Sequence, residues 1–447
     1  MINLPYVRQF RSIYRLFKRV NHKESITKTL HCSLNLCLVM LIWNRTKFDR
    51  GNNMIKNKIK SVFFILLVWT IVIPNSIYAL ENQDLPLYSE SVILLDAKSG
   101  QTLYEKNSQV EMPPASITKI ATAIYAIEKG HLEDIVTVSE NARNVDGTRV
   151  YLEVGEQVPL MKLIQGLVIN SGNDAGVAIA EHVSGSIDEF ITDFNSYLKE
   201  EIGVQHTTFK NPHGLYDPEH VTTAEDMAKI TQYAMKNETF MEIFQTSELA
   251  WDGQTWDTTI VNHHEMVRDK EYEGISGGKN GFVQESGFTL VTTASREKIS
   301  LIAVTLNAMS DNQAYEDTKT LLDYGFQNFE TEKIMANEQF TDHLNNTYML
   351  NEDEYVTKRL GEIITKEVIS TGELEMNGDN GRSIKKIPLT KIKSVETNKK
   401  MDSEVVVPDE VKEKESGNKH LLLLVPFSLF LALFLSVFFY VQVRKTS

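Results

Sequence analysis

Cysteine is nearly absent from this chain of 447 residues. Its two cysteines, Cys32 and Cys37, both lie near the start. The long remainder has no thiol, which excludes a disulfide framework, a thiolate metal site and a cysteine nucleophile there. Positive charge is also in deficit, since 46 Lys and Arg stand against 60 Asp and Glu, giving a formal net charge of −14. This acidity argues against a nucleic-acid partner.

An apolar run near the beginning of the chain predicts an exported protein. Residues 62–73 follow a basic stretch that begins after Met54 and precede a small residue, Ala79. This is the pattern of a secretory signal peptide at 54–79 with cleavage near Ala79, and an uncleaved membrane anchor is the alternative. We expect translation to start at Met54, so residues 1–53 are an uncertain extension. Peptides from 1–53 found by mass spectrometry of native cells would contradict this.

A second apolar run lies at the other end. Residues 421–443 are almost wholly apolar and match the roughly 20 residues that a transmembrane helix needs. Arg444 and Lys445 follow, which favours a cytoplasmic C-terminus. The preceding segment, about 390–419, is rich in Lys, Glu, Ser and Asn and predicts a flexible stalk. We therefore expect a cell-membrane protein with one C-terminal span and an extracytoplasmic body.

The body carries strand and helix patterns in a definite order. Residues 91–96 and 102–105 flank a polar turn and predict one hairpin, and residues 288–295 and 299–307 predict another. Helical spacing marks residues 160–168, 175–183, 187–202, 224–235 and 311–326. Most of residues 131–260 is expected to be helix and loop. The economical fold is α+β, with an antiparallel sheet built from the two ends of the region and a helical insert between them.

A length of 447 residues predicts more than one domain. Short strand-like pieces after residue 330 predict a small β-rich domain. The expected parts are residues 1–53 (extension), 54–79 (signal peptide), 80–330 (α+β domain), 331–389 (β-rich domain), 390–419 (stalk), 420–443 (transmembrane anchor) and 444–447 (cytoplasmic tail).

The most informative stretch starts at Pro113 and Pro114, which end a strand-like segment, and continues as an apolar run to Gly130. We expect a helix from about Ser116 with Gly130 near its C-cap. A helix places the Ser116 hydroxyl and the Lys119 amine on one face, about one turn apart. Apolar neighbours predict burial of Lys119, which disfavours its charged form and makes it a base for a serine nucleophile. Because Ser-x-x-Lys alone is a weak signal, the alternative is a helix-capping serine and a solvated lysine.

Two more motifs follow along the chain. Ser171 and Asn173 lie in a Ser-Gly-Asn between two apolar stretches, which predicts a loop capping the next helix. Lys279 lies among glycines just before the second hairpin, where exposed backbone would let another chain approach a strand edge. Taken alone, Ser171 and Asn173 are more typical of turn and cap residues, and an ordinary Gly-rich turn is the alternative for the Lys279 stretch.

Together, the three motifs resemble those of the penicillin-binding protein and serine β-lactamase superfamily, and more closely the low-molecular-mass D-alanyl-D-alanine carboxypeptidases. The resemblance covers about residues 85–330. Its motifs are Pro-Ala-Ser-Ile-Thr-Lys at 114–119, Asn-Ser-Gly-Asn-Asp-Ala at 170–175, Asn-Pro-His-Gly-Leu at 211–215, Thr-Thr-Ala-Glu-Asp at 222–226 and Lys-Asn-Gly-Phe at 279–282. It implies a β-lactamase/transpeptidase-like fold, and the small β domain and membrane anchor fit that family's layout.

The resemblance also implies an activity. Ser116 would attack the peptide bond between the two terminal D-alanines of a peptidoglycan stem pentapeptide, with Lys119 as base and Ser171 passing a proton to the leaving amine. The implied substrate-binding residues are Asn173, Lys279, Asn280, Gly281 and Phe282. Backbone N–H groups of Ser116 and Phe282 would form the oxyanion hole. β-Lactam antibiotics would inhibit covalently, and no metal or cofactor is implied.

The sequence departs from the family pattern in one motif. Asn280 stands where the family usually has threonine, so carboxylate binding would come from an amide on a longer arm. Residues 306–313 contain no basic residue, although related enzymes often place an arginine there. Carboxylate binding would then rest mainly on Lys279. The His263-His264-Glu265 run lacks the partners of a metal site, and His213 is expected to be structural.

Two other functions compete with the carboxypeptidase. A β-lactamase of the same superfamily would need a dedicated carboxylate base for fast deacylation, and no such motif is identified after Asn173, although Glu200 and Glu201 are present. A catalytically weakened cell-wall-binding homologue would keep the scaffold and lose catalysis through Asn280. The lifetime of a penicillin adduct separates the first alternative from a carboxypeptidase, and the absence of any adduct identifies the second.

Overall fold

The computed structural model describes residues 85–379 and 381–393. Within these two ranges, no helix combines the length and the apolar character that crossing a bilayer requires. The predicted extension (1–53), signal peptide (54–79), anchor (420–443) and tail (444–447), with most of the stalk, lie outside the described residues.

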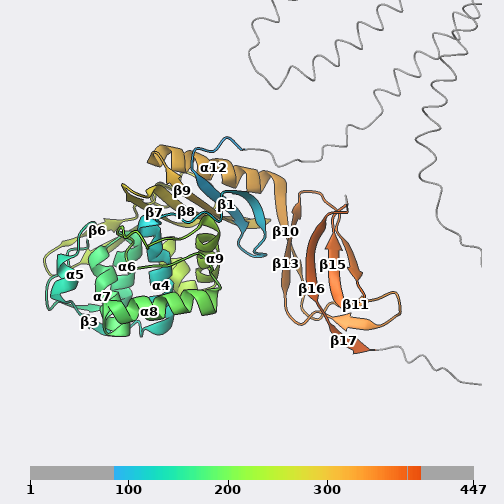
Figure 1. The fold of residues 1–447 in the computed structure, drawn as a ribbon, viewed down its shortest axis with the longest axis horizontal. Coiled ribbons are helices and arrows are strands. Elements are labelled where there is room, and N and C mark those ends of the chain that lie inside the picture. Colours follow the sequence, from blue (N-terminus) through green and yellow to red (C-terminus); the bar gives the residue numbers. More distant parts are fainter. Residues whose placement is uncertain (1–84, 380, 394–447) are drawn as a thin grey trace, which may run out of the picture. The chain divides into compact units, whose positions relative to one another are not determined.

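A five-stranded antiparallel sheet forms the centre of the α+β region. Its strands follow the order β2-β1-β9-β8-β7, so β7 is an edge strand (Figure 1). Their bounds are β1 Ser91–Asp96, β2 Thr102–Lys106, β7 Ile275–Val283, β8 Gly287–Arg296 and β9 Ile299–Ala308. Leu94 of β1 pairs with Ala303 of β9, which joins the two ends of the region as predicted. β9 is buried almost throughout, which explains its continuous apolar sequence.

Helices lie on both sides of this sheet (Figure 1). α12, Asp311–Asn328, packs against β8 and β9 on one side, and α4, α6, α7, α8 and α9 lie on the other. The helices between β2 and β7 are η1 Ala115–Ile117, α4 Thr118–Lys129, α5 Glu140–Asn144, α6 Leu160–Ile169, α7 Asn173–Ser184, α8 Ile187–Tyr197, the π-helical turn η2 Leu198–Ile202, α9 Ala224–Ala234, α10 Glu238–Phe244 and α11 Glu265–Asp269. The antiparallel sheet with a helical insert is therefore confirmed.

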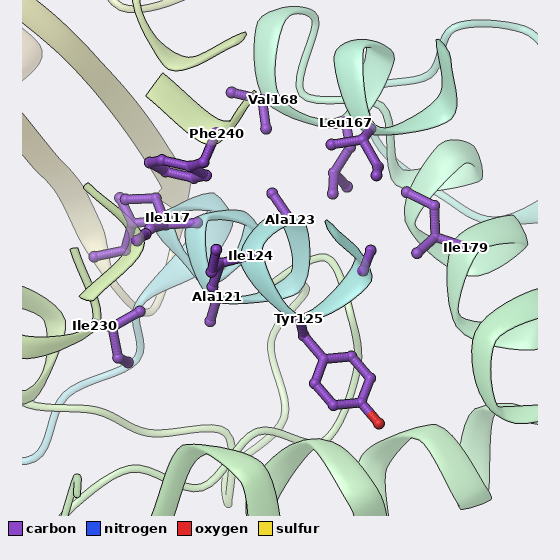
Figure 2. Close-up of a cluster of buried hydrophobic side chains, with 14 of the residues drawn as sticks. Ile117, Ala121, Ala123, Ile124, Tyr125, Leu167, Val168, Ile179, Ile230 and Phe240 are labelled. Atoms are coloured by element: carbon purple, nitrogen blue, oxygen red, sulfur yellow. The ribbon is translucent and has the colours of Figure 1, made fainter. Parts of the chain in front are cut away.

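α4 runs through the middle of the main hydrophobic core. All of its residues from Thr118 to Ala126 are buried. Figure 2 shows its side chains surrounded by Leu167 of α6, Ile179 of α7 and Phe240 of α10. A helix enclosed on all sides cannot turn a lysine toward water, so any lysine in its first turn is forced into the protein interior.

After α12 the chain forms small antiparallel sheets. β10 pairs with β13, β11-β12-β17 form a second sheet and β14-β15-β16 a third. The bounds are β10 Phe329–Ile334, β11 Gln339–Thr341, β12 Thr347–Met349, β13 Glu354–Arg359, β14 Thr365–Val368, β15 Glu373–Asn377, β16 Ser383–Pro388 and β17 Thr390–Lys393. A separate apolar cluster that includes Val356 and Leu374 forms their core.

The structure differs from the sequence prediction in the helical insert and at the predicted stalk. The helical insert also contains two pairs of short strands, β3 Ile135–Thr137 with β4 Gln157–Pro159, and β5 Glu248–Asp252 with β6 Asp257–Val261. With three residues each in β3 and β4 and five each in β5 and β6, these strands are too short to show a clear period. β17 lies at the start of the predicted stalk, because its polar sequence pairs with the free edge of β12.

Candidate active site

Ser116 stands at the start of the buried helix, in η1 just before α4. Its Oγ lies 2.8 Å from Lys119 Nζ, so the two side chains share one face as predicted. The N-cap of α4 is Ile117, which rules out the capping alternative for Ser116. Ala115, the residue before it, has a φ of 52°. This left-handed conformation costs a non-glycine residue roughly 1–2 kcal/mol and marks a tight turn that presents Ser116.

Lys119 is fully buried, which excludes the solvated alternative. Burial, and then the charge of nearby Lys279, hold the pKa of Lys119 well below its usual range, while Asp174 raises it. Nζ lies 2.6 Å from the His213 carbonyl oxygen, to which it donates. In its neutral form the amine still has a lone pair for the Ser116 hydroxyl proton. This is the arrangement that a base for serine requires.

Ser171 lies in the loop between α6 and α7, as predicted. The residue is buried and has a φ of 60°, another left-handed position at this site. Asn173 begins α7, and its Nδ2 donates to the Asp146 carbonyl 2.7 Å away. The loop is therefore fixed by contacts with residues 146–152 as well as by its own helix.

Asp174 is a site residue that the sequence analysis did not single out. Its buried carboxylate accepts hydrogen bonds from the backbone N–H groups of Val150, Leu152 and Ala175, at 2.9 to 3.1 Å. Burial raises its pKa, and these N–H groups oppose that rise. The only sequence signal is its position, next to Asn173 at the start of a helix that continues with the uncharged residues 175–180. It ties the Ser171 loop to the segment that covers it.

The third motif lies on the edge strand β7. Lys279 is buried, and burial lowers its pKa to about 7. Its Nζ lies 2.9 Å from the carbonyl oxygen of Asn280 and 3.3 Å from that residue's Oδ1. At Gly281 an added Cβ would lie 2.6 Å from Ser116 N, so only glycine lets the strand pass the nucleophile. Phe282 is 57% exposed, with its ring 4.5 Å from that of Phe288.

The loop at 211–215 completes the site. His213 supplies the carbonyl that holds Lys119, and Pro212 O accepts a hydrogen bond from Thr122 of α4 at 2.7 Å. Gly214 has a φ of 90°, and an added Cβ would lie 1.9 Å from the Ala115 carbonyl oxygen. The sequence showed this motif, but not that its backbone binds the base.

The residues considered for a carboxylate base or a metal site, Glu200, Glu201 and His264, lie in other surroundings than the Ser116 site. Glu200 and Glu201 are exposed on the π-helical turn η2. His264 is buried and hydrogen-bonds Thr292 at 2.8 Å. Across the described residues, no group of three or more His, Cys, Asp and Glu side chains is arranged to hold a metal ion. The assembled groups are a serine hydroxyl, a buried amine and a second lysine, which suit acyl transfer.

Comparison with known proteins agrees with a site suited to acyl transfer. The D-alanyl-D-alanine carboxypeptidase family model matches residues 79–310. The chain is 34% identical over 260 residues to carboxypeptidase DacF of Bacillus subtilis, covering 56% of this chain and 65% of that relative. It is 31% identical over 278 residues to DacD of Escherichia coli, covering 58% of this chain and 70% of the relative. Penicillin-binding protein 5 of Haemophilus influenzae superposes with a TM-score of 0.63 at 26% identity, covering 70% of this chain and 98% of that one.

The match to the curated relatives covers only part of their length. The chain spans 65% of DacF and 64% of DacA of Haemophilus influenzae. The matched region, residues 79–310, nevertheless contains every motif named above. This chain belongs to the D-alanyl-D-alanine carboxypeptidase family.

Proposed function

We propose that this protein is a serine-type D-Ala-D-Ala carboxypeptidase acting on peptidoglycan stem pentapeptides. The observation that carries the proposal is the 2.8 Å separation of Ser116 Oγ from Lys119 Nζ, with the lysine fully buried and its pKa depressed. A neutral amine at hydrogen-bond distance is the activated-nucleophile arrangement of a serine acyltransferase.

Acylation begins at the carbonyl between the two terminal D-alanines. Ser116 Oγ forms a bond to that carbon while its proton passes to Lys119 Nζ. The oxyanion is stabilised by the backbone N–H groups of Ser116 and Phe282. As the C–N bond breaks, Ser171 delivers its hydroxyl proton to the leaving nitrogen and takes up the proton held on Lys119 Nζ. Free D-alanine departs, and the Lys119 amine is neutral again.

Deacylation repeats this chemistry with water. Lys119 takes a proton from the water as its oxygen attacks the ester carbonyl, and the proton returns to Ser116 Oγ as the C–O bond breaks. The shortened stem peptide leaves with a new carboxylate. A β-lactam acylates the same oxygen, but its ring-opened amine stays attached, so the adduct is long-lived.

Substrate binding divides between two elements. Lys279 and Asn280 on β7 hold the terminal carboxylate, and Asn173 holds a substrate amide. Because peptidoglycan lies outside the cytoplasm, we place the catalytic region there as well. The predicted transmembrane segment at 420–443 would hold it to the cell membrane. The external location and the stem-peptide substrate both belong to the proposal.

The test measures D-alanine release from a peptide ending in D-Ala-D-Ala, with fluorescent penicillin labelling alongside. Ser116→Ala abolishes both signals, and Lys119→Ala lowers release by orders of magnitude because the pair acts as a unit. Lys129→Ala, an exposed lysine at the end of the same helix, is the matched control and stays near wild type.

Three outcomes discriminate among functions. A stable penicillin adduct together with D-alanine release supports the carboxypeptidase. Rapid loss of the adduct with penicillin turnover identifies a β-lactamase. Absence of both adduct and release identifies a wall-binding homologue and overturns the proposal.

A further inference from the structure

A buried chain of hydrogen bonds leads to the nucleophile from a histidine that no motif contains. The Lys210 backbone N–H donates to His220 Nδ1 at 3.0 Å. His220 Nε2 lies 2.9 Å from Thr118 Oγ1, and Thr118 Oγ1 donates to the Ala115 carbonyl at 2.8 Å. Since a backbone N–H can only donate, Nδ1 accepts and the ring proton is on Nε2. Every donor in the chain therefore points toward Ala115.

The chain lies in the protein interior. Thr118 is fully buried and His220 is 2% exposed. The Phe209 ring stacks on the imidazole with centroids 4.8 Å apart, which fixes the plane of the ring. Burial lowers the pKa of His220 to about 3, with Asp217 opposing the shift and Lys119 adding to it. The imidazole is neutral at working pH, so the direction of the hydrogen bonds does not change.

Ala115, where the chain ends, is the strained residue before Ser116. Its carbonyl accepts from both the backbone N–H and the hydroxyl of Thr118. The same carbonyl packs against Gly214, so it is confined from two sides. Rotation of this peptide would turn the Ser116 N–H and displace Oγ from Lys119. A left-handed alanine persists only where its surroundings over-determine it.

We propose that His220 is a positioning residue that acts through Thr118 to hold the Ala115–Ser116 peptide in the geometry needed for acylation. The expected effect of this positioning role on kcat rests on the proposed function. His220 does not contact the substrate, so its removal lowers kcat and leaves KM nearly unchanged.

A matched pair of substitutions isolates the hydrogen bond to Thr118. His220→Asn places an amide near Nδ1 but ends short of Thr118, whereas His220→Gln reaches the position of Nε2 and restores the donor. Both lose the ring stacked on Phe209, so both lower the melting temperature similarly. We expect His220→Asn to slow acylation of Ser116 by fluorescent penicillin about tenfold, and His220→Gln to recover most of that loss.

A second pair tests the link to Ala115. Thr118→Val removes the hydroxyl at nearly constant shape, and Thr118→Ser keeps it. Ala115→Gly favours positive φ without help, so in the His220→Asn background it should restore part of the rate. A crystal structure of His220→Asn gives a readout independent of activity, in which Ser116 Oγ is expected to move away from Lys119 Nζ.

The outcomes separate the two proposals. Equal rates for His220→Asn and wild type, or no advantage of Gln over Asn, overturn the positioning role, as does an unchanged Ser116–Lys119 distance in the crystal. If the wild-type protein neither labels nor releases D-alanine, the proposed function fails, and the distance in the variant crystal still decides the role of His220.

Discussion

At the scale of single residues, the site contains two buried lysines, Lys119 and Lys279, for which the proposed mechanism requires opposite charge states. Lys119 must be neutral to accept a proton, and Lys279 must be charged to hold a carboxylate. Burial lowers the pKa of both, and the charge on Lys279 lowers that of Lys119 further. A charged Lys279, the proposed partner of the substrate carboxylate, therefore also helps to keep the Lys119 amine neutral.

This coupling predicts a bell-shaped pH dependence of kcat/KM. The acid limb appears as Lys119 gains its proton. The alkaline limb appears as Lys279, whose pKa is about 7, loses its proton and with it the attraction for a carboxylate. Assays from pH 5 to about 9 with a D-Ala-D-Ala peptide test both limbs.

A ligand without a carboxylate is the control for the alkaline limb. Acylation by a penicillin methyl ester should lose the fall above about pH 7 that the free acid shows. A fall that persists with the ester would show that Lys279 is not the titrating group.

Residues near each other in the chain were the predictable part of the site. Ser116 and Lys119 are one helical turn apart, so their proximity follows from the helix alone. The partners that fix them could not be predicted, because the His213 carbonyl and His220 come from 94 and 102 residues further along the chain. A backbone carbonyl also leaves no mark on residue type. The roles of Ser171, Asn173 and Lys279 remain predictions.

At the scale of elements, long periodic segments were predictable and short ones were not. Helices α6 and α9 and strands β8 and β9 lie within a few residues of their predicted bounds. The predicted single helix at 187–202 instead ends in the π-helical turn η2. A polar strand such as β17 depends on its partner, which local sequence does not show.

A prediction at the scale of elements concerns Asp174, whose buried carboxylate lies at the start of α7. Asp174→Asn replaces one acceptor oxygen by an N–H₂ group that faces backbone donors. We expect the free energy of unfolding to fall by about 1–3 kcal/mol and acylation to slow, because the Ser171 loop loses its anchor. Denaturant unfolding and penicillin labelling measure the two effects.

An exposed aspartate on the same covering segment is the control. Asp146 touches Asn173 through its main-chain carbonyl, and its side chain is exposed. Asp146→Asn should therefore stay within about 0.5 kcal/mol of wild type. Equal effects of the two substitutions would contradict the anchoring role of Asp174.

At the scale of the whole molecule, one buried carboxylate joins the large sheet to the β-rich region. Asp96 of β1 is fully buried. It accepts from Thr331 of β10 at 2.7 Å, from Ser99 at 2.9 Å, and from Thr357 of β13. Strands from two separate apolar cores thus share one acceptor, and we expect this shared acceptor to couple their unfolding.

Asp96→Ala should uncouple the two cores. Several hydroxyls would lose their buried acceptor, at a cost of about 1–3 kcal/mol each. We expect calorimetry to show a separate, lower transition for the β-rich region. Acylation of Ser116 should stay near wild type, because β1 lies three strands from β7, or about 14 Å. Asp269→Ala, which removes an exposed ion pair with Arg268, is the control and should leave the melting profile unchanged. A single transition at the wild-type temperature in Asp96→Ala would mean that apolar packing, and not this carboxylate, holds β10 and β13 to the sheet.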